Sequence, residues 1–339
     1  LETARLLQGE GIPTVVASSP RSELLARARK SGLATEPFAI SNLSFLNPFK
    51  LLKIRRFLKR EKVTAIVLNN PSDFKAAGIA AKWAGVERIV YRKGSARKIR
   101  PTRLNRWLFG RVVTSVIANS IATRDMMLAG DPDLVPAGKI HIIYNSFDLA
   151  GYDAAPCEPV YRRQGGELIL GNAGRMSVQK NQHDLLLMAA RLKELDLDFK
   201  LLIAGDGKLM PELVAAVDEL GLKERVVFLG FVENIRAFME SLDIFVLTSR
   251  WEGFGYVLAE AMASRKPVLA YDLSSNPEIV ADQETGYLVP PFDTRALADK
   301  AALLMGDAGL RERMGQAGRA RVARMFSVEA ATAVLKRLV

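Results

Sequence analysis

Apolar residues along this chain alternate between two spacings. Short consecutive runs are typical of buried strands, whereas positions that recur every three or four residues predict amphipathic helices. In the first half, the predicted strands are Thr14–Ala17, Ala65–Leu68, Arg88–Val90, Ser115–Ala118 and Ile140–Ile143. The predicted helices between them are Leu1–Gly9, Pro48–Arg60, Asp73–Ala84, Arg103–Phe109 and Ile121–Ala129.

The second half repeats this alternation. Its predicted strands are Leu168–Gly171, Lys200–Ala204, Val226–Leu229, Ile244–Leu247 and Val268–Ala270. Its predicted helices are Gln182–Glu194, Met210–Leu220, Ile235–Ser241, Tyr256–Ser264, Leu310–Phe326 and Val328–Leu338. Strands that alternate with helices predict an α/β protein with two doubly wound, Rossmann-like domains. Ligands are then expected at the carboxyl ends of the strands, in the cleft between the domains.

The pattern also predicts a domain organisation. A segment rich in Gly and Pro, with little periodicity, predicts a linker at 150–166 between a first domain at 1–149 and a second at 167–318. We expect a C-terminal helical segment, 319–339, to pack back on the first domain. A doubly wound domain ordinarily opens with a strand and a glycine-rich turn, but Leu1 already lies in a predicted helix. We therefore expect that first strand to be missing from this sequence.

Composition narrows the class of protein. The chain has 339 residues, of which 49% are hydrophobic and 25% charged, as in globular proteins. A single cysteine, Cys157, excludes an internal disulfide framework and favours a reducing compartment. Charge is uneven, because 1–148 hold 25 Lys and Arg against 11 Asp and Glu, whereas 149–339 hold 23 against 26. We expect an anionic partner for the first half.

Two glutamates flank a glycine turn in the second half. Glu252 and Glu260 lie eight positions apart, with Gly253, Phe254 and Gly255 between a predicted strand and a predicted helix. A strand, a glycine turn and a helix together direct backbone N–H groups and the positive end of a helix dipole at an anion. Ionised carboxylates only accept hydrogen bonds, so glutamates here suit a phosphate ligand that also carries hydroxyls, such as a nucleotide sugar. A capping acid and an exposed acid on one helix explain the pair equally well.

A second glycine-containing segment follows the first strand of the second domain. Gly174, Arg175 and Lys180 lie between that strand and the next helix. Glycine allows close approach of the backbone to a ligand, and the two basic side chains can bind phosphate. Gly205 and Gly207 follow the next strand and could form another wall of a nucleotide site. Solvated charges and an ordinary turn are the alternatives, and the spacing is not that of a Walker loop.

No metal site is predicted. Two Asp-x-Asp pairs, Asp131/Asp133 and Asp196/Asp198, fall where turns are expected, and His141 and His183 are the only histidines. Neither a zinc site nor a Ser-His-Asp triad follows from this set.

Basic residues of the first half fall into two segments. The predicted helix at 48–60 is basic and amphipathic, which suits an anionic membrane surface, although a solvated helix face explains it too. The stretch 88–111 holds nine Lys and Arg and no acidic residue. Nucleic acid is the less favoured partner, because the second half is acidic. The candidate acceptor-binding or membrane-facing residues are Lys53, Arg56, Lys59, Arg92, Lys93, Arg97 and Lys98.

Taken together, the motifs of 140–324 resemble the retaining glycosyltransferases of the GT-B fold, often called glycosyltransferase group 1 or family four. The resemblance rests on an ordered set of segments rather than on any one of them. They are Ile143–Asp148, Gly174–Asn181, Gly205–Gly207, Glu252–Glu260, Lys266–Ala270 and Glu284–Pro291. The first domain resembles the family in outline only. Many relatives have a histidine there that faces the donor sugar, whereas Asn69–Ser72 and Tyr91–Ser95 contain none.

The resemblance implies roles for the matching positions. Arg175 and Lys180 would bind the donor diphosphate, Glu252 would contact hydroxyls of the transferred sugar, and Glu260 would hold the ribose. Backbone N–H groups at 253–255 would face phosphate or sugar. The family is thought to pass the acceptor's proton to the leaving phosphate, so neither a strong protein base nor a metal is implied. Arg92 or Lys93 could replace the absent histidine.

The predicted function is therefore transfer of a sugar from a nucleoside diphosphate, UDP or GDP, to a hydroxyl of a lipid-linked or surface-glycan acceptor. The first domain would bind the acceptor and the second the nucleotide sugar, without a further cofactor. We expect a cytoplasmic protein, peripheral on the inner leaflet of the membrane. Two alternatives remain at this point: a nucleotide-sugar epimerase of the same fold, and a non-catalytic protein that binds anionic lipid or nucleic acid.

Overall fold

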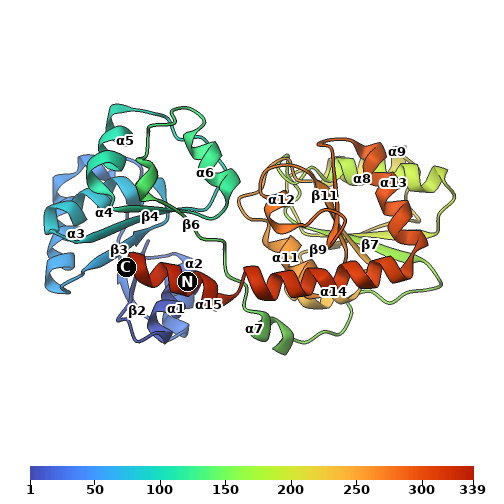
Figure 1. The fold of residues 1–339 in the computed structure, drawn as a ribbon, viewed down its shortest axis with the longest axis horizontal. Coiled ribbons are helices and arrows are strands. Elements are labelled where there is room, and N and C mark those ends of the chain that lie inside the picture. The colour runs from blue at the N-terminus through green and yellow to red at the C-terminus, as the bar shows by residue number, and fades with distance from the viewer. The chain divides into compact units, whose positions relative to one another are not determined.

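The computed structural model describes residues 1–339, apart from the side chain of Glu2. The chain divides into two compact units, drawn in Figure 1. Unit 1 comprises Leu1–Tyr144 together with Val328–Val339, and unit 2 comprises Asn145–Ser327. The C-terminal residues from Val328 onward thus belong to unit 1, and the chain leaves unit 1 near Tyr144 and returns to it near Val328.

Unit 1 is built on a four-stranded parallel sheet with the order β3-β4-β5-β6, beside a two-stranded parallel sheet, β1-β2. Apolar side chains of α3, α4 and η2 form the larger core, and those of α1 and α15 pack with Val90 of β4 and Ile117 of β5 in a second cluster. The strands are β1 (Val15–Ser18), β2 (Ala34–Pro37), β3 (Ala65–Leu68), β4 (Arg88–Lys93), β5 (Ser115–Ala118) and β6 (Ile140–Ile142). The helices are α1 (Glu2–Gly9), α2 (Glu23–Lys30), η1 (Ser44–Leu46), α3 (Pro48–Arg60), α4 (Pro71–Ala84), α5 (Arg103–Trp107), η2 (Leu108–Val112), α6 (Ile121–Leu128), η3 (Ala137–Lys139) and α15 (Val328–Leu338).

Helix α3 illustrates how the sequence specifies a local element. The Asn47 side chain accepts a hydrogen bond from the Lys50 N–H, which satisfies one of the free donors at the helix start, and Pro48 occupies a first-turn position. Leu51, Ile54 and Leu58 lie on one face and are buried in the larger core. The buried apolar face of this helix is therefore used inside unit 1, and its outward face, with basic residues and the exposed Phe49, remains for a membrane or another partner.

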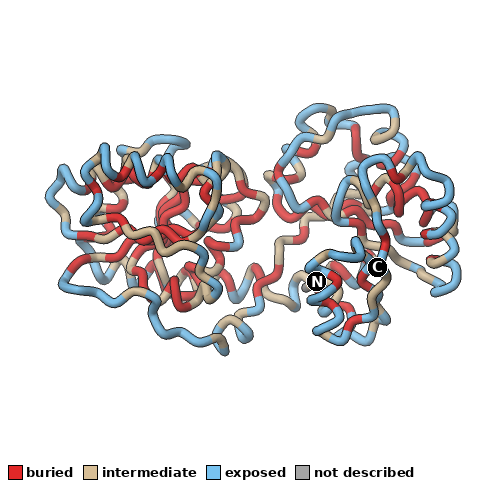
Figure 2. Tube along the Cα trace, turned by 180° about the vertical axis from the view of Figure 1, so that it is seen from behind, coloured by how far each residue is buried: buried red, intermediate tan, exposed pale blue. Residues whose placement is uncertain are grey.

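Unit 2 contains a six-stranded parallel sheet with the order β12-β11-β10-β7-β8-β9. Figure 2 shows buried segments in the interior of this unit. The strands are β7 (Leu168–Ala173), β8 (Phe199–Ala204), β9 (Val226–Gly230), β10 (Ile244–Leu247), β11 (Val268–Tyr271) and β12 (Gly286–Val289). The helices are α7 (Leu149–Ala154), α8 (Gln182–Glu194), α9 (Met210–Glu219), α10 (Ile235–Glu240), α11 (Tyr256–Ala263), α12 (Asn276–Ile279), α13 (Thr294–Gly306) and α14 (Ala308–Met325).

The strand order of unit 2 reverses next to β7. From β7 the chain builds outward through β8 and β9, and it then returns to place β10 on the other side of β7. At such a reversal, the loops that follow the two central strands diverge to opposite faces and leave room for a ligand at the carboxyl edge of the sheet. The loops after β7 and β10 are therefore the expected ligand-binding loops of unit 2.

Several elements differ from the prediction. Helices α2, α7, α12 and α13 and strands β2 and β12 were not predicted, and α7 overlaps the start of the predicted linker. Strand β2 has only intermediate or exposed residues, so it carries no buried apolar run. The six-residue helix α7 is capped by Asp148, whose side chain accepts a hydrogen bond from the Gly151 N–H. This is a local cap rather than a periodic signal. The predicted parallel-sheet α/β architecture is confirmed in both units.

Candidate functional site

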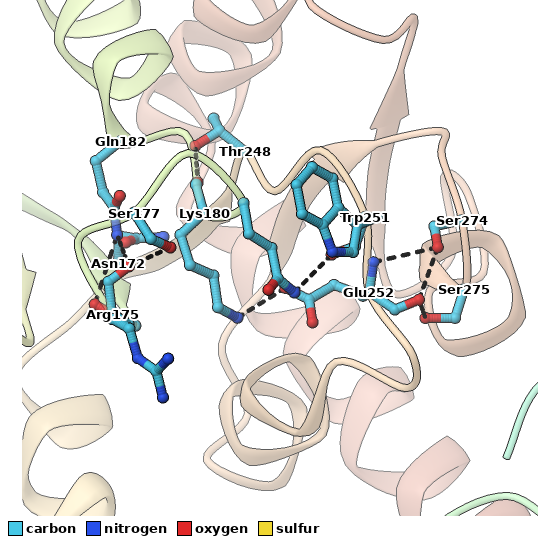
Figure 3. A network of polar contacts seen from close by, with 12 residues as sticks. Asn172, Arg175, Ser177, Lys180, Gln182, Thr248, Trp251, Glu252, Ser274 and Ser275 are labelled. Atoms are coloured by element: carbon cyan, nitrogen blue, oxygen red, sulfur yellow. Dashed lines mark hydrogen bonds and ion pairs between the residues drawn. The ribbon is translucent and has the colours of Figure 1, made fainter. Parts of the chain in front are cut away.

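Two loops of unit 2 meet at the carboxyl edge of its sheet. The first, 174–181, joins β7 to α8, and the second, 248–255, joins β10 to α11. The Arg250 N–H donates to the Gln179 carbonyl at 2.8 Å, and Gln179 Nε2 donates to the Trp251 carbonyl at 3.0 Å. Figure 3 shows these loops side by side, with the contacts between them. Two segments about seventy residues apart in sequence thus form one surface.

The most direct link between the loops is an ion pair. Lys180 Nζ lies 2.7 Å from Glu252 Oε1 (Figure 3). The side chains are only 19% and 9% exposed, respectively, so the pair is shielded from bulk water. Partial burial strengthens such a pair and makes the loss of either member costly. The structure therefore brings together two residues that the sequence had assigned to different parts of the ligand.

Hydroxyl groups hold both members of the pair by their backbones. Thr248 Oγ1 donates to the Asn181 carbonyl at 2.9 Å, next to Lys180. The Glu252 N–H donates to Ser274 Oγ at 3.1 Å, and the same hydroxyl donates to the Glu252 carbonyl at 2.7 Å. Sequence reasoning did not assign Thr248 or Ser274 to the site. The one local signal is that Ser274 has a positive φ of 58°, a conformation uncommon for serine.

Arg175 is on the same loop as Lys180 but is exposed. Its carbonyl accepts a hydrogen bond from Gln182 Nε2 at 3.1 Å, which fixes the loop, while its guanidinium extends away from the backbone (Figure 3). The buried Gln182 Oε1 and Asn172 Oδ1 have no hydrogen-bond partner among the described residues. The loop thus presents one fixed cation, Lys180, and one solvent-facing cation, Arg175.

The predicted glycines shape the loop. A Cβ on Gly174 would lie 3.2 Å from Lys180 Cδ and Cε, so the absence of a side chain there makes room for the lysine. A Cβ on Gly205 would collide with the Gly174 carbonyl, and one on Gly207 would collide with the Met176 carbonyl. The loop after β8 therefore supports the loop after β7 by backbone contact, and that support explains Gly205 and Gly207 without a ligand.

The glycine turn before α11 carries three of the predicted donor-binding residues, Gly253, Phe254 and Gly255. Gly255 has a φ of +69° and precedes α11 without a side-chain cap. Phe254 is 2% exposed, and its ring packs against Tyr256 and Phe326. The Phe254 ring is therefore part of the core of unit 2, and only its backbone and that of Gly253 can face a ligand.

Both helices that leave the site begin without a side-chain cap. Asn181, with a φ of +50°, precedes α8, and Gly255 precedes α11. Uncapped helix starts carry partial positive charge and favour anions. Together with Lys180 and Arg175, they make this edge of the sheet suited to a phosphate group.

Glu260 lies on α11, one turn beyond the helix start. Burial raises the pKa of its carboxyl to about 7, and the positive charge of Lys180 acts in the opposite direction. No described side chain donates a hydrogen bond to this carboxylate, whereas its backbone carbonyl accepts from the Tyr152 hydroxyl at 3.2 Å. A half-buried acceptor within the field of Lys180 suits hydroxyl groups of a ligand.

The predicted acceptor-binding or membrane-facing residues lie in unit 1. Lys53, Arg56 and Lys59 are exposed on α3, whereas Arg97 and Lys98 are exposed in the loop after β4. Lys93 differs, because it is 7% exposed at the end of β4. This burial argues against a membrane-facing position for Lys93, and its acceptor-binding role stays a prediction.

Two kinds of feature are absent from the described residues, a metal-ligand cluster and a membrane-spanning helix. Among the described side chains, no three His, Cys, Asp or Glu residues cluster as a metal site would require. No helix in the described chain has the length and apolar character to cross a membrane.

Comparison with known proteins adds family information. Residues 158–321 match the family model described as Glycosyl transferases group 1, and residues 1–150 match the model of Glycosyltransferase Family 4. The chain is 34% identical over 202 residues to N-acetylgalactosamine-N,N'-diacetylbacillosaminyl-diphospho-undecaprenol 4-alpha-N-acetylgalactosaminyltransferase of Campylobacter jejuni, covering 59% of this chain and 53% of that protein. It is 32% identical over 197 residues to N-acetyl-alpha-D-glucosaminyl L-malate synthase of Bacillus anthracis, covering 57% and 51%, respectively. The chain thus spans about half the length of these curated relatives.

A solved structure extends the comparison to the whole fold. Anabaena Alr3699/HepE, in complex with UDP, superposes with a TM-score of 0.85 at 23% identity, over 99% of this chain and 94% of that one. At this identity the likeness shows the fold alone. The predicted GT-B fold is confirmed.

Proposed function

Because this chain belongs to the group 1 glycosyltransferases of the GT-B fold, we propose that it transfers a sugar from a nucleoside diphosphate to an acceptor hydroxyl. The observation that carries the proposal is the shielded Lys180–Glu252 pair between two uncapped helix starts. A cation beside an acceptor-only carboxylate fits a ligand in which phosphate and hydroxyl groups are neighbours. In a nucleotide sugar, the diphosphate and the sugar hydroxyls are neighbours at the glycosidic linkage.

The roles of the charged groups follow from the charge that develops in the reaction. As the bond from the anomeric carbon to the diphosphate breaks, its electron pair passes to the diphosphate oxygen. Fixed positive groups near that oxygen then stabilise the transition state more than the ground state. We assign this role to Lys180 and Arg175, with the starts of α8 and α11. Glu252 would shift from Lys180 toward hydroxyls of the transferred sugar.

The acceptor oxygen forms the new bond to the anomeric carbon and loses its proton. We propose that the proton passes to the departing diphosphate oxygen, on the same face of the sugar, so that the anomeric configuration is retained. Glu260 would hold the ribose, because its half-buried carboxylate can accept from two hydroxyls. No separate protein base is assigned.

The acceptor is proposed to be lipid-linked or part of a surface glycan. Support comes from the Campylobacter jejuni relative, whose name includes a diphospho-undecaprenol acceptor, and from a 39% identical segment of a lipopolysaccharide core mannosyltransferase of Rhizobium meliloti. A lipid-linked acceptor requires access to a membrane surface.

One surface of unit 1 has the character of an interfacial contact. Leu43, Leu46 and Phe49 are 68%, 67% and 81% exposed, at η1 and the start of α3. Phe49 shares the outward face of α3 with Lys53 and Arg56, since these positions recur at helical spacing. Exposed apolar side chains beside basic ones favour an anionic lipid surface. We therefore propose peripheral attachment to the inner leaflet by this lipid-facing surface, defined as Leu43, Leu46, Phe49, Lys53, Arg56 and Lys59.

The experiment that tests the proposal uses the full chain and nucleotide sugars labelled at the anomeric carbon. UDP-glucose, UDP-N-acetylglucosamine and GDP-mannose are incubated with and without a lipid-linked glycan extract. Release of the nucleoside diphosphate that depends on the extract, with the label retained in its anomeric configuration in the glycan, supports the proposal. Recovery of the label as an epimerised nucleotide sugar, or no turnover of any donor, contradicts it.

A further inference from the structure

Unit 1 has a buried cation that the proposed reaction does not yet use. Lys93 is the last residue of β4 and is 7% exposed. Its Nζ donates to Ser95 Oγ at 3.1 Å, and no described carboxylate pairs with it. A buried ammonium group is costly unless it has a counter-charge. The structure keeps this cation in place with a single neutral partner.

A second cation lies nearby. Arg97 is exposed in the loop after β4, and both burial and the Arg97 charge lower the pKa of the Lys93 ammonium. The stretch 88–111 around them contains nine basic residues and no acidic one. Two like charges brought together repel each other, and a shared anion removes that repulsion.

The neighbouring strand supplies an unsatisfied acceptor. The parallel register pairs Lys93 with Ala118 of β5, so Asn119 begins the loop directly beside it. Asn119 is 2% exposed, and its Nδ2 donates to the Gly94 carbonyl at 3.3 Å. Its Oδ1 is buried without a hydrogen-bond partner among the described residues. A buried acceptor of this kind is satisfied by a hydroxyl donor.

There is room for a ligand over this backbone. A Cβ placed on Gly94 would meet no atom within 4 Å, and Gly94, Ser95 and Arg97 are exposed. The carboxyl ends of β4 and β5 are adjacent in the sheet, at the edge where parallel α/β sheets bind ligands. The residues around Lys93 are therefore accessible from one side, and they carry the positive charges of Lys93 and Arg97.

We propose that Lys93, Ser95, Arg97 and Asn119, which we call the Lys93 site, bind a phosphate group that carries a hydroxyl next to it, as in a sugar phosphate. Lys93 and Arg97 contact the phosphate, and Asn119 Oδ1 accepts from the hydroxyl. This inference rests on the proposed function, because it names the acceptor class: the acceptor carries a phosphate or diphosphate close to the sugar that is extended.

The test measures binding of glucose 6-phosphate, glucose and UDP to the full chain by calorimetry. Glucose 6-phosphate is expected to bind saturably and glucose to show no measurable binding. Lys93→Met keeps an unbranched side chain as far as Cε, removes the buried charge and should weaken glucose 6-phosphate binding by about tenfold or more. Arg97→Gln, at an exposed position, should weaken it in the same direction, and Lys30→Gln, at an exposed position of α2 in the same unit, should not change it.

UDP separates this inference from the function on which it rests. UDP affinity should stay within twofold in Lys93→Met, since the nucleotide is assigned to unit 2. Glucose 6-phosphate binding that Lys93→Met and Arg97→Gln leave unchanged overturns the Lys93 site even if UDP binds. A parallel loss of UDP affinity in these variants overturns it as well, because the site would then belong to the donor. Failure of UDP to bind the wild-type chain contradicts the proposed function instead.

The source of the phosphate is tested with vesicles of phosphatidylcholine containing phosphatidic acid. Soluble glucose 6-phosphate should compete with the Lys93-dependent part of vesicle binding. Vesicle binding that is insensitive both to glucose 6-phosphate and to Lys93→Met, combined with no binding of the sugar phosphate itself, contradicts the inference and assigns the anion contact to the lipid-facing surface.

Discussion

Lys180 Nζ and Glu252 Oε1 lie 2.7 Å apart, although 72 positions separate the residues in the chain. The ion pair links the loop after β7 to the loop after β10, at the point where the strand order of unit 2 reverses. In the absence of a ligand, each side chain satisfies the charge of the other. A bound diphosphate offers Lys180 a stronger partner and releases Glu252 for hydroxyl groups, so one contact couples recognition of phosphate to recognition of sugar.

Replacement of Lys180 by Ala should lower turnover by on the order of a hundredfold or more, because the developing diphosphate charge loses a fixed cation. Initial rates of nucleoside diphosphate release measure the change. Lys223→Gln is the matched control, since Lys223 is a surface lysine of unit 2 paired with Asp218. Wild-type turnover in a folded Lys180→Ala variant would exclude the assigned role.

The stability of the protein should depend on the charge of Glu260. Its folded-state pKa of about 7 is raised above the ordinary value of 4.5. The folded state therefore holds an extra proton between these values, and the free energy of unfolding should fall as pH rises through that window. Glu260→Gln removes the titration. Thermal unfolding from pH 5 to pH 8 should show the variant gaining stability relative to wild type, and a constant difference over this range would contradict the burial of the charge.

Two glycines allow the effects of collision and backbone conformation to be separated. Gly205→Ala places a Cβ against the Gly174 carbonyl at a φ of +130°, whereas Gly230→Ala meets nothing within 4 Å at a φ of +66°. Gly230→Ala should cost roughly 1 kcal/mol of unfolding free energy. Gly205→Ala should cost roughly 2–4 kcal/mol and should also weaken nucleotide binding, because the loop that carries Lys180 is displaced. Equal costs for the two variants in denaturant unfolding would argue against the supporting contact.

The lipid-facing surface predicts a specific loss of membrane binding. The double variant Leu46→Ser and Phe49→Ser should bind vesicles of phosphatidylglycerol with an affinity lower by about tenfold or more. The reason is that two exposed apolar side chains no longer enter the membrane interface. Sedimentation with vesicles measures this. Phe231→Ser is the control, since Phe231 is 79% exposed in unit 2. An equal loss of vesicle affinity in the double variant and in Phe231→Ser would mean that membrane binding is not localised to the lipid-facing surface.

The sequence predicted long, strongly periodic elements best. Helix α8 occupies the predicted range, Gln182–Glu194, because five of its buried apolar residues recur at helical spacing. Strand β2 and helix α2 were missed, since the strand has no buried position and the helix buries only Leu25 and Ala28. Local pattern is a weak signal where tertiary contacts decide the structure.

The candidate site was predicted as a set of residues but not as an arrangement. Turn motifs identified Lys180 and Glu252 separately, whereas their contact depends on β10 lying beside β7, which is a property of strand order. Lys93 was predicted to bind an acceptor or to face a membrane because it lies in a basic stretch, whereas its burial depends on its place beside β5 in the folded sheet. The spacing of residues along the chain predicts neither the Lys180–Glu252 contact nor the burial of Lys93.

The central claim is that the edge of the unit 2 sheet holds a nucleoside diphosphate between Lys180, Glu252 and Glu260. Calorimetric titration of the full chain with UDP and GDP tests it most directly, with Glu260→Ala and Lys180→Ala alongside the wild type. The account predicts that one nucleotide binds the wild type in the presence of EDTA and that both variants weaken this binding by about tenfold or more. Absence of binding by either nucleotide, or equal binding by all three proteins, would contradict the account.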